Sequence, residues 1–228
     1  MNAIITGATK GIGRAIAEKF AKEGINLAVC SRNADELAEL KSSLAVDVHT
    51  QVVDVSKKEN VLGFAAFCSE KFDTVDWLIN NAGVFLPGDL HDEADGQLEK
   101  LMETNLYSAY HLTRAILPQL KKQGSGTIVN ISSVAGLHAY PQGGSYSISK
   151  FALTGFSKNL RFELKEENIK VTTVYPGATW SNAWANSGVD PERIMEANDI
   201  AESIFALKHL SPKAVVEDII LRPQLGDL

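Results

Sequence analysis

The sequence is poor in cysteine and histidine and carries no excess of positive charge. Cys30 and Cys68 are its only cysteines, and they form neither a CxxC pair nor a zinc-ligand spacing. Both lie among apolar residues, so we interpret them as small core residues of a protein from a reducing compartment. The five histidines are scattered, so we predict no metal site. A net charge of −6 argues against a nucleic-acid or anionic-membrane surface.

Long hydrophobic runs are also missing. No apolar segment approaches the length that spans a membrane. Residues 2–6 already have the pattern of a strand, which leaves no room for a signal peptide. With 45% apolar and 22% charged residues in a chain of 228, the composition is that of a globular protein with a full core. We therefore expect a cytoplasmic protein with no membrane partner and no nucleic-acid partner.

Short apolar runs alternate with amphipathic segments along the whole chain. The runs typical of strands are residues 2–6, 26–30, 48–53, 75–79, 126–131, 169–175 and 214–221. The segments with helical periodicity are residues 12–23, 33–44, 57–72, 93–122, 145–167 and 198–208, and Pro118 is expected to kink the end of the fourth. Such alternation indicates right-handed βαβ crossovers and a parallel sheet. We predict one α/β domain, residues 1–228, with a Rossmann-like, doubly wound parallel sheet of about seven strands flanked by helices.

A glycine-rich turn follows the first strand and opens the first helix. Gly7, Gly11 and Gly13 have the spacing G-x-x-x-G-x-G. Glycines at such a turn let the backbone bend tightly and approach a pyrophosphate, which rests on the positive amino end of the helix. The same cluster could be only a tight strand–helix turn. Its place at the start of a βαβ unit favours a dinucleotide site.

The end of the second strand bears on the choice of dinucleotide. A site that prefers NAD places an acid there, against the ribose 2′-hydroxyl. This strand ends in Ser31 and Arg32, and no acid comes before Asp35. The Arg32 guanidinium can bind a 2′-phosphate as a fork, with Ser31 and Lys10 as further donors. We therefore predict NADP(H); the alternative is that Arg32 and Lys10 are solvated surface charges.

Tyr146 and Lys150 are four residues apart, so on a helix they share one face. A phenol has a pKa of about 10, too high for efficient proton transfer near neutrality. An ammonium about 4 Å away, at an effective dielectric of about 20, could lower that pKa by up to about three. The pair is therefore a candidate acid–base group, and Ser133 precedes it by 13 residues. Because Tyr-x-x-x-Lys is common by chance, the other motifs must show whether this pair is catalytic.

Together these motifs resemble the short-chain dehydrogenase/reductase superfamily over nearly the whole chain. The glycine turn is similar to its cofactor motif, and Asp54-Val55 to its adenine-contacting pair. Asn80-Asn81-Ala82-Gly83 resembles its structural motif, and Pro176-Gly177 the turn that borders the nicotinamide. The resemblance implies cofactor contacts from Gly7, Thr9, Lys10, Gly11, Ile12, Gly13, Ser31, Arg32, Asp54, Val55, Asn81, Ala82, Gly83, Tyr146, Lys150, Pro176, Gly177, Thr179 and Ser181. Ser181 stands where the family often has threonine, and it keeps a hydroxyl for the nicotinamide carboxamide.

The resemblance also implies a catalytic tetrad of Asn105, Ser133, Tyr146 and Lys150. In the reductive direction the nicotinamide would deliver hydride to a carbonyl carbon, Tyr146 would protonate the alkoxide and Ser133 would hydrogen-bond the same oxygen. Lys150 would lower the Tyr146 pKa and hold the nicotinamide ribose. Asn105 would position a water that links Lys150 to solvent; the alternative is that it satisfies a local helix irregularity. Ser132 is the rival of Ser133, but the spacing of 13 favours Ser133.

Residues 178–197 lack a clear period, and we expect an irregular flap there over the carboxyl edge of the sheet, where substrate would enter. The candidates to line a substrate pocket are Phe85, Leu137, Tyr140, Trp180 and Trp184. The two tryptophans could face a flat or apolar ketone, or they could staple the flap to the core.

The resemblance leaves the substrate open. Residues 215–228 and the Pro-Gly-Ala at 176–178 are more similar to bacterial sepiapterin-reductase-like members than to 3-ketoacyl-(acyl-carrier-protein) reductases, which usually have a longer tail. We expect an NADPH-dependent reductase of small-molecule carbonyls, with the 3-ketoacyl reductase as the alternative. A non-catalytic NADP-sensing regulator is the alternative of another class. Family members usually pair through the helices at 93–122 and 145–167, so a homodimer or homotetramer is expected.

Overall fold

The computed structural model describes residues 1–181, 184 and 188–227. The strands found there form one parallel sheet in the order β3-β2-β1-β4-β5-β6-β7. They are β1 (Asn2–Thr6), β2 (Asn26–Ser31), β3 (Val48–Val52), β4 (Trp77–Asn80), β5 (Gly126–Ile131), β6 (Ile169–Pro176) and β7 (Asp218–Leu221). The strand order reverses between β1 and β4, which is where doubly wound sheets open a crevice for ligands. The predicted α/β fold is confirmed.

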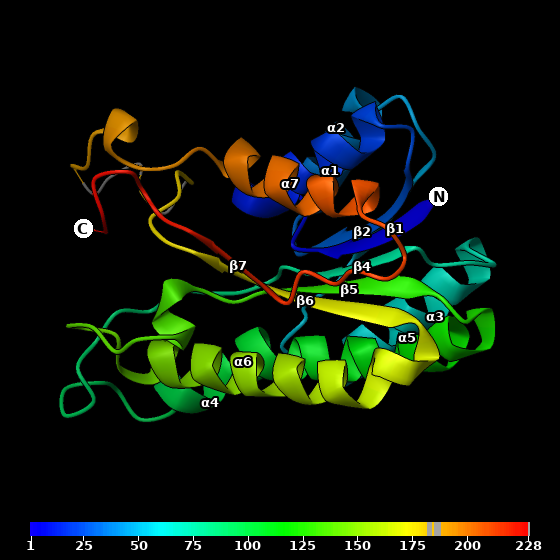
Figure 1. Cartoon of the computed structure of the whole chain (residues 1–228). Coiled ribbons are helices and arrows are strands. Elements are labelled where there is room, and N and C mark those ends of the chain that lie inside the picture. Colours follow the sequence, from blue (N-terminus) through cyan, green and yellow to red (C-terminus); the bar gives the residue numbers. More distant parts are fainter. Residues whose placement is uncertain (182–183, 185–187, 228) are drawn as a thin grey trace.

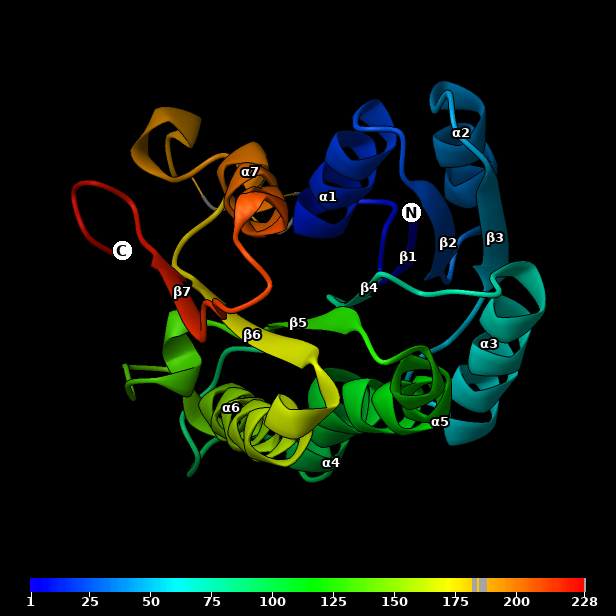
Figure 2. The same cartoon turned by 45° about the vertical axis from the view of Figure 1, so that its right-hand side comes forward.

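Helices cover both faces of the sheet (Figures 1 and 2). One face carries α1 (Gly11–Lys22), α2 (Ala34–Ser43) and α7 (Ala197–Phe205). The other carries α3 (Lys58–Lys71), α4 (Gln97–Met102), α5 (Ser108–Gln123) and α6 (Gly144–Leu164). Among the residues that the structure describes, no helix has the length and apolar character needed to cross a membrane.

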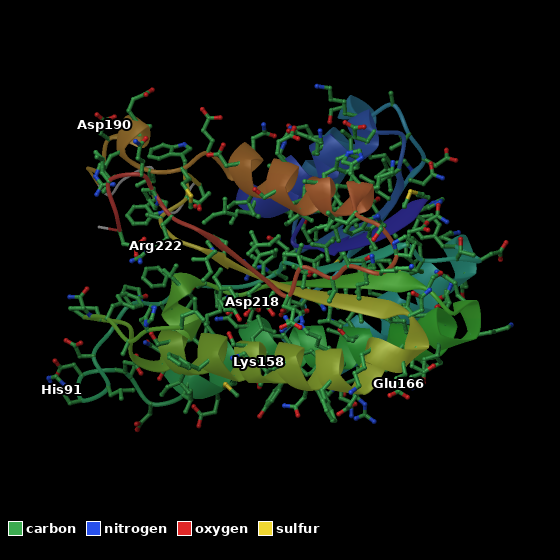
Figure 3. The ribbon with its side chains drawn as sticks, viewed as in Figure 1. His91, Lys158, Glu166, Asp190, Asp218 and Arg222 are labelled. Atoms are coloured by element: carbon green, nitrogen blue, oxygen red, sulfur yellow. The ribbon has the colours of Figure 1, made fainter. Side chains whose placement is uncertain are left out.

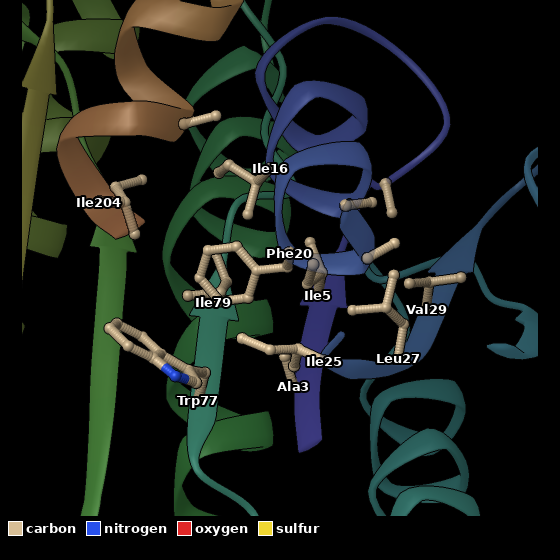
Figure 4. Packing of buried hydrophobic residues seen from close by; sticks show 14 of the residues in the cluster. Ala3, Ile5, Ile16, Phe20, Ile25, Leu27, Val29, Trp77, Ile79 and Ile204 are labelled. Atoms are coloured by element: carbon tan, nitrogen blue, oxygen red, sulfur yellow. The ribbon is translucent and has the colours of Figure 1, made fainter. Parts of the chain in front are cut away.

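The two helical layers explain why the central strands are apolar on both sides. In β1, Ala3 and Ile5 belong to the cluster with α1, α2 and α7, whereas Ile4 belongs to the cluster with α3, α5 and α6. Successive side chains of a strand point to opposite faces, so both sets are buried. Figure 4 shows the first cluster, in which Phe20 of α1 meets Trp77 of β4 edge-on at 5.2 Å between ring centroids.

Cys30 and Cys68 are buried free thiols on the α3 side of the sheet. Burial raises the pKa of Cys30 to about 12, and it also raises the pKa of Cys68, so both stay protonated near neutrality. The prediction that they are core residues is confirmed.

The predicted helix over 93–122 is wrong in its extent. The segment begins as a loop and turns helical only at α4, and a π-helical stretch, Glu103–Tyr107, separates α4 from α5. Past this stretch α5 continues through Pro118 to Gln123. The last strand is also shorter than predicted, because β7 pairs with β6 only from the Thr173–Asp218 register onward.

Candidate active site

Many of the predicted site residues follow four neighbouring strands. Because the strands are parallel, the glycine turn after β1, residues 81–83 after β4, residues 132–133 after β5 and residues 176–177 at the end of β6 all reach the same edge of the sheet. In Figure 3, His91, Asp190 and Arg222 mark this end of the molecule, opposite Glu166. The fold thus gathers side chains that are far apart in sequence.

The glycine turn needs its glycines for conformation and for space. Gly7 and Gly11 have φ of +66° and +52°, in the left-handed region. At Gly13 a Cβ would overlap the carbonyl oxygen of Gly7 and the Asn81 side chain. The amino end of α1 has no side-chain cap and no acidic residue in its first turn. Backbone donors there are thus available to an anion.

Asn81 joins the two strands that flank the switch point. Its Nδ2 donates to the carbonyl oxygens of Thr6, at 2.9 Å, and Gly7, at 3.1 Å. In return the Thr6 hydroxyl accepts from the backbone N–H groups of Asn81 and Ala82, both at 3.0 Å. These bonds hold the loop after β4 against the glycine turn.

The first turn of α2, just after β2, holds a carboxylate that the sequence analysis did not single out. Glu36 accepts from Lys10 Nζ at 2.7 Å and from the Thr9 hydroxyl at 2.9 Å, and these two bonds, Lys10 first, hold the pKa of Glu36 below its usual range. Lys10 is thus paired with Glu36, although its side chain remains 56% exposed. Arg32 is exposed and forms no ion pair with a described residue, and the Ser31 hydroxyl is within hydrogen-bond distance of the backbone carbonyl and N–H of Asn33.

Asp54 and Val55 follow β3 beside this region. Asp54 Oδ1 accepts from the hydroxyl of Ser56 at 2.8 Å and from its backbone N–H at 3.0 Å, which lowers the pKa of the Asp54 carboxyl. Val55 packs against the α3 side of the core. The carboxylate is therefore fixed and ionised at the edge of the sheet.

Tyr146 and Lys150 lie on the first two turns of α6. The Lys150 ammonium is buried, donates to the carbonyl oxygen of Ile131 at 2.9 Å and lies 5.8 Å from the centre of the Tyr146 ring. A Cβ at Gly83 would lie 3.5 Å from Lys150 Nζ and 3.2 Å from Asn105 Oδ1. Gly83 therefore lets the loop after β4 pass directly over both groups.

Asn105 sits in the π-helical stretch and is 1% exposed. Its Oδ1 accepts from the backbone N–H of Val84 at 2.8 Å, and its Nδ2 donates to the Val84 carbonyl at 3.0 Å and to the Ser149 hydroxyl at 2.9 Å. The side chain therefore ties the loop after β4 to α6 and does not serve the backbone of its own helix.

The two serines after β5 have different partners. The Ser133 hydroxyl lies near enough to the Tyr146 hydroxyl to lower the pKa of the phenol, and its Oγ accepts from the backbone N–H of Ala135 at 3.1 Å. Ser132 is buried and its hydroxyl donates to the carbonyl oxygen of Lys150 at 3.2 Å. Ser133 is the serine that reaches the phenol.

The predicted lowering of the Tyr146 pKa is wrong in this structure. Burial raises the pKa of Tyr146, and the hydrogen bond from Ser133 opposes this only in part. Burial also lowers the pKa of Lys150 to about 8. Lys150 therefore keeps its proton near neutrality, but it loses that proton at a lower pH than the phenol would. The phenol is therefore a neutral donor near neutrality.

Two of the predicted pocket residues, Phe85 and Tyr140, lie beside Tyr146. Phe85 is about half exposed and lies edge-on against the Tyr146 ring, with 4.8 Å between centroids. Tyr140 is also partly exposed, and burial followed by the charge of Tyr146 raises its pKa to about 12. Leu137 is partly buried in the turn between Ser133 and Tyr140.

The predicted flap is described only in part, since residues 182–183 and 185–187 lie outside the described residues. Trp180 is held by its backbone N–H, which donates to the Met195 carbonyl at 2.7 Å, and the Trp184 N–H donates to the Ser181 carbonyl at 2.9 Å. Both tryptophans are partly buried.

The Pro-Gly turn at the end of β6 is anchored on both sides. The Gly177 N–H donates to the Leu221 carbonyl of β7 at 2.7 Å, and the Thr179 hydroxyl donates to the Gly177 carbonyl at 3.0 Å. A Cβ at Gly11 would lie 3.3 Å from the Ser181 Cβ. Ser181 therefore lies over the glycine turn.

Known proteins share both the sequence pattern and the fold. The family model for short chain dehydrogenase matches residues 1–191. Sepiapterin reductase of Chlorobaculum tepidum is 34% identical over 238 residues, which cover 99% of this chain and 97% of that protein. An alcohol dehydrogenase from the archaeon Thermococcus sibiricus, solved with 5-hydroxy-NADP, is 29% identical, with a TM-score of 0.89 over 100% of this chain and 98% of that one. L-sorbose reductase from Gluconobacter frateurii, solved with NADPH and L-sorbose, is 27% identical, with a TM-score of 0.88 over 96% and 94% of the two chains. This chain is thus a member of the short-chain dehydrogenase family.

Proposed function

We propose that the whole chain acts as one domain that reduces a ketone or aldehyde to an alcohol with NADPH. The observation that carries the proposal is the convergence of Asn105, Ser133, Tyr146 and Lys150 from three separate segments at the crevice of the sheet. A non-catalytic sensor would have no use for a proton donor there.

The residues present fit a dinucleotide. The glycine turn and the uncapped amino end of α1 suit a pyrophosphate, since a side chain at Gly13 would fill the cradle. Asp54 and Val55 would border the adenine, residues 81–83 the central part, and Pro176, Gly177, Thr179 and Ser181 the nicotinamide. Arg32, free of any described ion pair, would receive the 2′-phosphate. The solved relatives named above hold NADPH or an NADP derivative, which supports this choice. When bound, the cofactor supplies the hydride.

The tetrad would supply the proton. Ser133 would hydrogen-bond the carbonyl oxygen of the substrate, and Tyr146 would donate its phenol proton to that oxygen as negative charge develops there. The neutral phenol described above is in the right state to donate. Lys150, with a pKa of about 8, carries its proton near neutrality and can replenish the phenol. Asn105 would fix the path by which Lys150 is reached by solvent protons.

Phe85 and Tyr140 give the pocket an aromatic wall beside Tyr146, which suits a flat or apolar carbonyl compound. The relative of this chain that is a sepiapterin reductase supports a substrate of that kind. We therefore favour a sepiapterin-like or general aromatic carbonyl substrate.

The test is NADPH oxidation against a panel of sepiapterin, a diketone, an aromatic aldehyde and an acetoacetyl thioester, with NADH in parallel. We expect turnover with NADPH and the aromatic carbonyls. Tyr146→Phe should keep NADPH binding and lose roughly 10²- to 10⁴-fold in kcat. Near-normal turnover by that variant would overturn the mechanism, and NADPH binding without turnover of any panel member would favour a sensor.

We also propose that two copies of the chain associate through α5 and α6. An apolar hollow on this surface is lined by Leu106, Tyr107, Tyr110, His111, Ala152 and Phe156. Tyr107 is 46% exposed, and Phe151 and Ile148 beside the hollow are similarly exposed. A second copy would remove this surface from water.

A further inference from the structure

The first turn of α6 is not capped by its own sequence. Gly143, at the N-cap, offers no side chain, and Gly144 has a φ of +32°. The first N–H groups of a helix have no partner within the helix, so they need one from elsewhere. This turn matters because it carries Tyr146.

Glu93, 52 residues earlier in the chain, supplies the missing acceptor. One of its carboxylate oxygens accepts from the Ser145 backbone N–H at 2.8 Å, and the other accepts from the Ser145 hydroxyl. A negative charge is favourable at the amino end of a helix. The bonds from the Ser145 hydroxyl and N–H hold the pKa of Glu93 below its usual range, so the cap is ionised near neutrality.

Two glycines make room for this contact. A Cβ at Gly144 would overlap the Glu93 carboxylate and the Gly88 carbonyl. A Cβ at Gly88 would lie 2.8 Å from Glu93 Cγ. The loop after β4 and the start of α6 therefore meet almost backbone to backbone.

Further bonds fix the same two segments. The Gly88 N–H donates to the Gln142 carbonyl at 3.0 Å, and the Gln142 N–H donates to Asp89 Oδ1 at 3.0 Å. Phe85, at the start of the same loop, packs against the Tyr146 ring. The loop thus touches α6 at its first turn and at the ring of the proton donor.

We infer that Glu93 is a positioning residue that holds the first turn of α6, and with it the Tyr146 hydroxyl, against Ser133. The inference rests on the proposed function. Lys150 lies one turn further along and is held separately by the Ile131 carbonyl. Losing the cap should therefore displace the phenol more than the ammonium, and should slow the chemical step more than it weakens cofactor binding.

The test compares Glu93→Ala with Glu93→Gln, and uses Asp92→Ala as the control. Asp92 is the neighbouring acid, and its exposed carboxylate pairs with His91. We measure kcat, the KM for NADPH, and hydrogen exchange of the amides at 143–149. Glu93→Ala should lower kcat roughly 10- to 100-fold with little change in the KM for NADPH, and should speed exchange at 143–149. Glu93→Gln keeps an oxygen that can accept from the Ser145 N–H, so it should stay within about fivefold of the wild type.

Unchanged kcat and unchanged exchange in Glu93→Ala would overturn the inference. So would a loss of activity that Asp92→Ala shares, or one that Glu93→Gln does not rescue. If Glu93→Ala does not fold, Gly144→Ala replaces it, since the added methyl group would displace the Glu93 carboxylate, and a normal kcat and exchange pattern in that variant would overturn the inference. This outcome can be told apart from a failure of the proposed function. Hydrogen exchange at residues 143–149 reports whether Glu93 protects the first turn of α6, even if the wild-type protein shows no turnover.

Discussion

Lys150 is buried with a backbone carbonyl as its hydrogen-bond partner, and this makes its charge costly. Its pKa in the fold is about 8, against about 10.4 for a lysine in an unfolded chain. Between these values the unfolded chain binds more protons than the folded one, so the free energy of unfolding rises with pH. Below about pH 8 both states are protonated and the full penalty of burying the ammonium remains.

Lys150→Met should therefore stabilise the protein near neutrality and lose that advantage as the pH rises. We expect the difference in unfolding free energy between variant and wild type to shrink by about 1.4 kcal/mol per pH unit from about pH 8 to 10. Urea unfolding across this range measures it. Lys158→Met, at an exposed position of the same helix, is the control and should show no such slope. An equally flat difference for Lys150→Met would mean that the ammonium is not desolvated.

Arg32 and Lys10 are not equivalent at the cofactor crevice, because Lys10 is engaged by Glu36 and Arg32 has no described ion pair. Arg32→Ala should raise the KM for NADPH roughly 10- to 100-fold and leave that for NADH nearly unchanged, since a hydrogen bond to a charged group is lost. Lys10→Ala should have a smaller effect because the charge of Lys10 is already offset by the Glu36 carboxylate. Lys22→Ala, at the far end of α1, is the control. Equal effects of Arg32→Ala on both cofactors would contradict a 2′-phosphate contact.

At the scale of elements, the strands were predictable and the helix after β4 was not. Apolar runs bounded by turns mark β1 and β5 to the residue, since both faces of such strands are buried. The break in the helix at Glu103–Tyr107 leaves no comparable mark. The π-helical turn places Asn105 where its side chain bonds to Val84 and Ser149. These partners are known only once the chain has folded.

The same limit explains the two carboxylates that were missed. Glu36 and Glu93 read as ordinary surface acids because their partners are not local in sequence: the Thr9 contact of Glu36 spans 27 residues and the Ser145 contact of Glu93 spans 52. The tetrad could be proposed earlier because its spacing matches a family pattern. The direction in which the Tyr146 pKa shifts could not be predicted from the sequence, because it depends on how deeply Lys150 and the phenol are buried together.

Gly13, in the first turn of α1, lies where the glycine turn contacts the loop after β4. Gly13→Ala would drive a methyl group into the Gly7 carbonyl and the Asn81 side chain, so we expect a loss of about 1–3 kcal/mol in unfolding free energy and weaker NADPH binding. Gly63→Ala in α3 is the matched control: its Cβ meets open space and should stabilise by about 0.5–1 kcal/mol. Urea unfolding and NADPH titration measure both. An unchanged unfolding free energy and unchanged NADPH binding in Gly13→Ala would show that the turn can accommodate the methyl group.

At the scale of the whole molecule, the helices on the two faces of the sheet differ in the apolar surface that they expose. On the α1 side, α7 packs beside α1 and Phe205 meets Phe20. On the other side, α5 and α6 present the apolar hollow and the exposed rings of Tyr107 and Phe151. A surface of this kind is unusual on a monomer, because contiguous apolar area in water is unfavourable. The asymmetry supports the proposed pairing of two copies across α5 and α6.

Tyr107→Asp should therefore dissociate the assembly. The ring is 46% exposed, so the substitution should change the stability of one copy by no more than about 0.5 kcal/mol. In a dimer, however, the new carboxylate would be buried without a partner against the same surface of the second copy. Sedimentation velocity at micromolar concentration should show the wild type as a dimer or larger and the variant as a 24.7 kDa species. Leu210→Asp, a similarly exposed apolar position after α7 on the opposite face, should stay assembled. A wild type that sediments only at 24.7 kDa would refute the pairing and would leave the hollow on α5 and α6 without the occupant proposed for it.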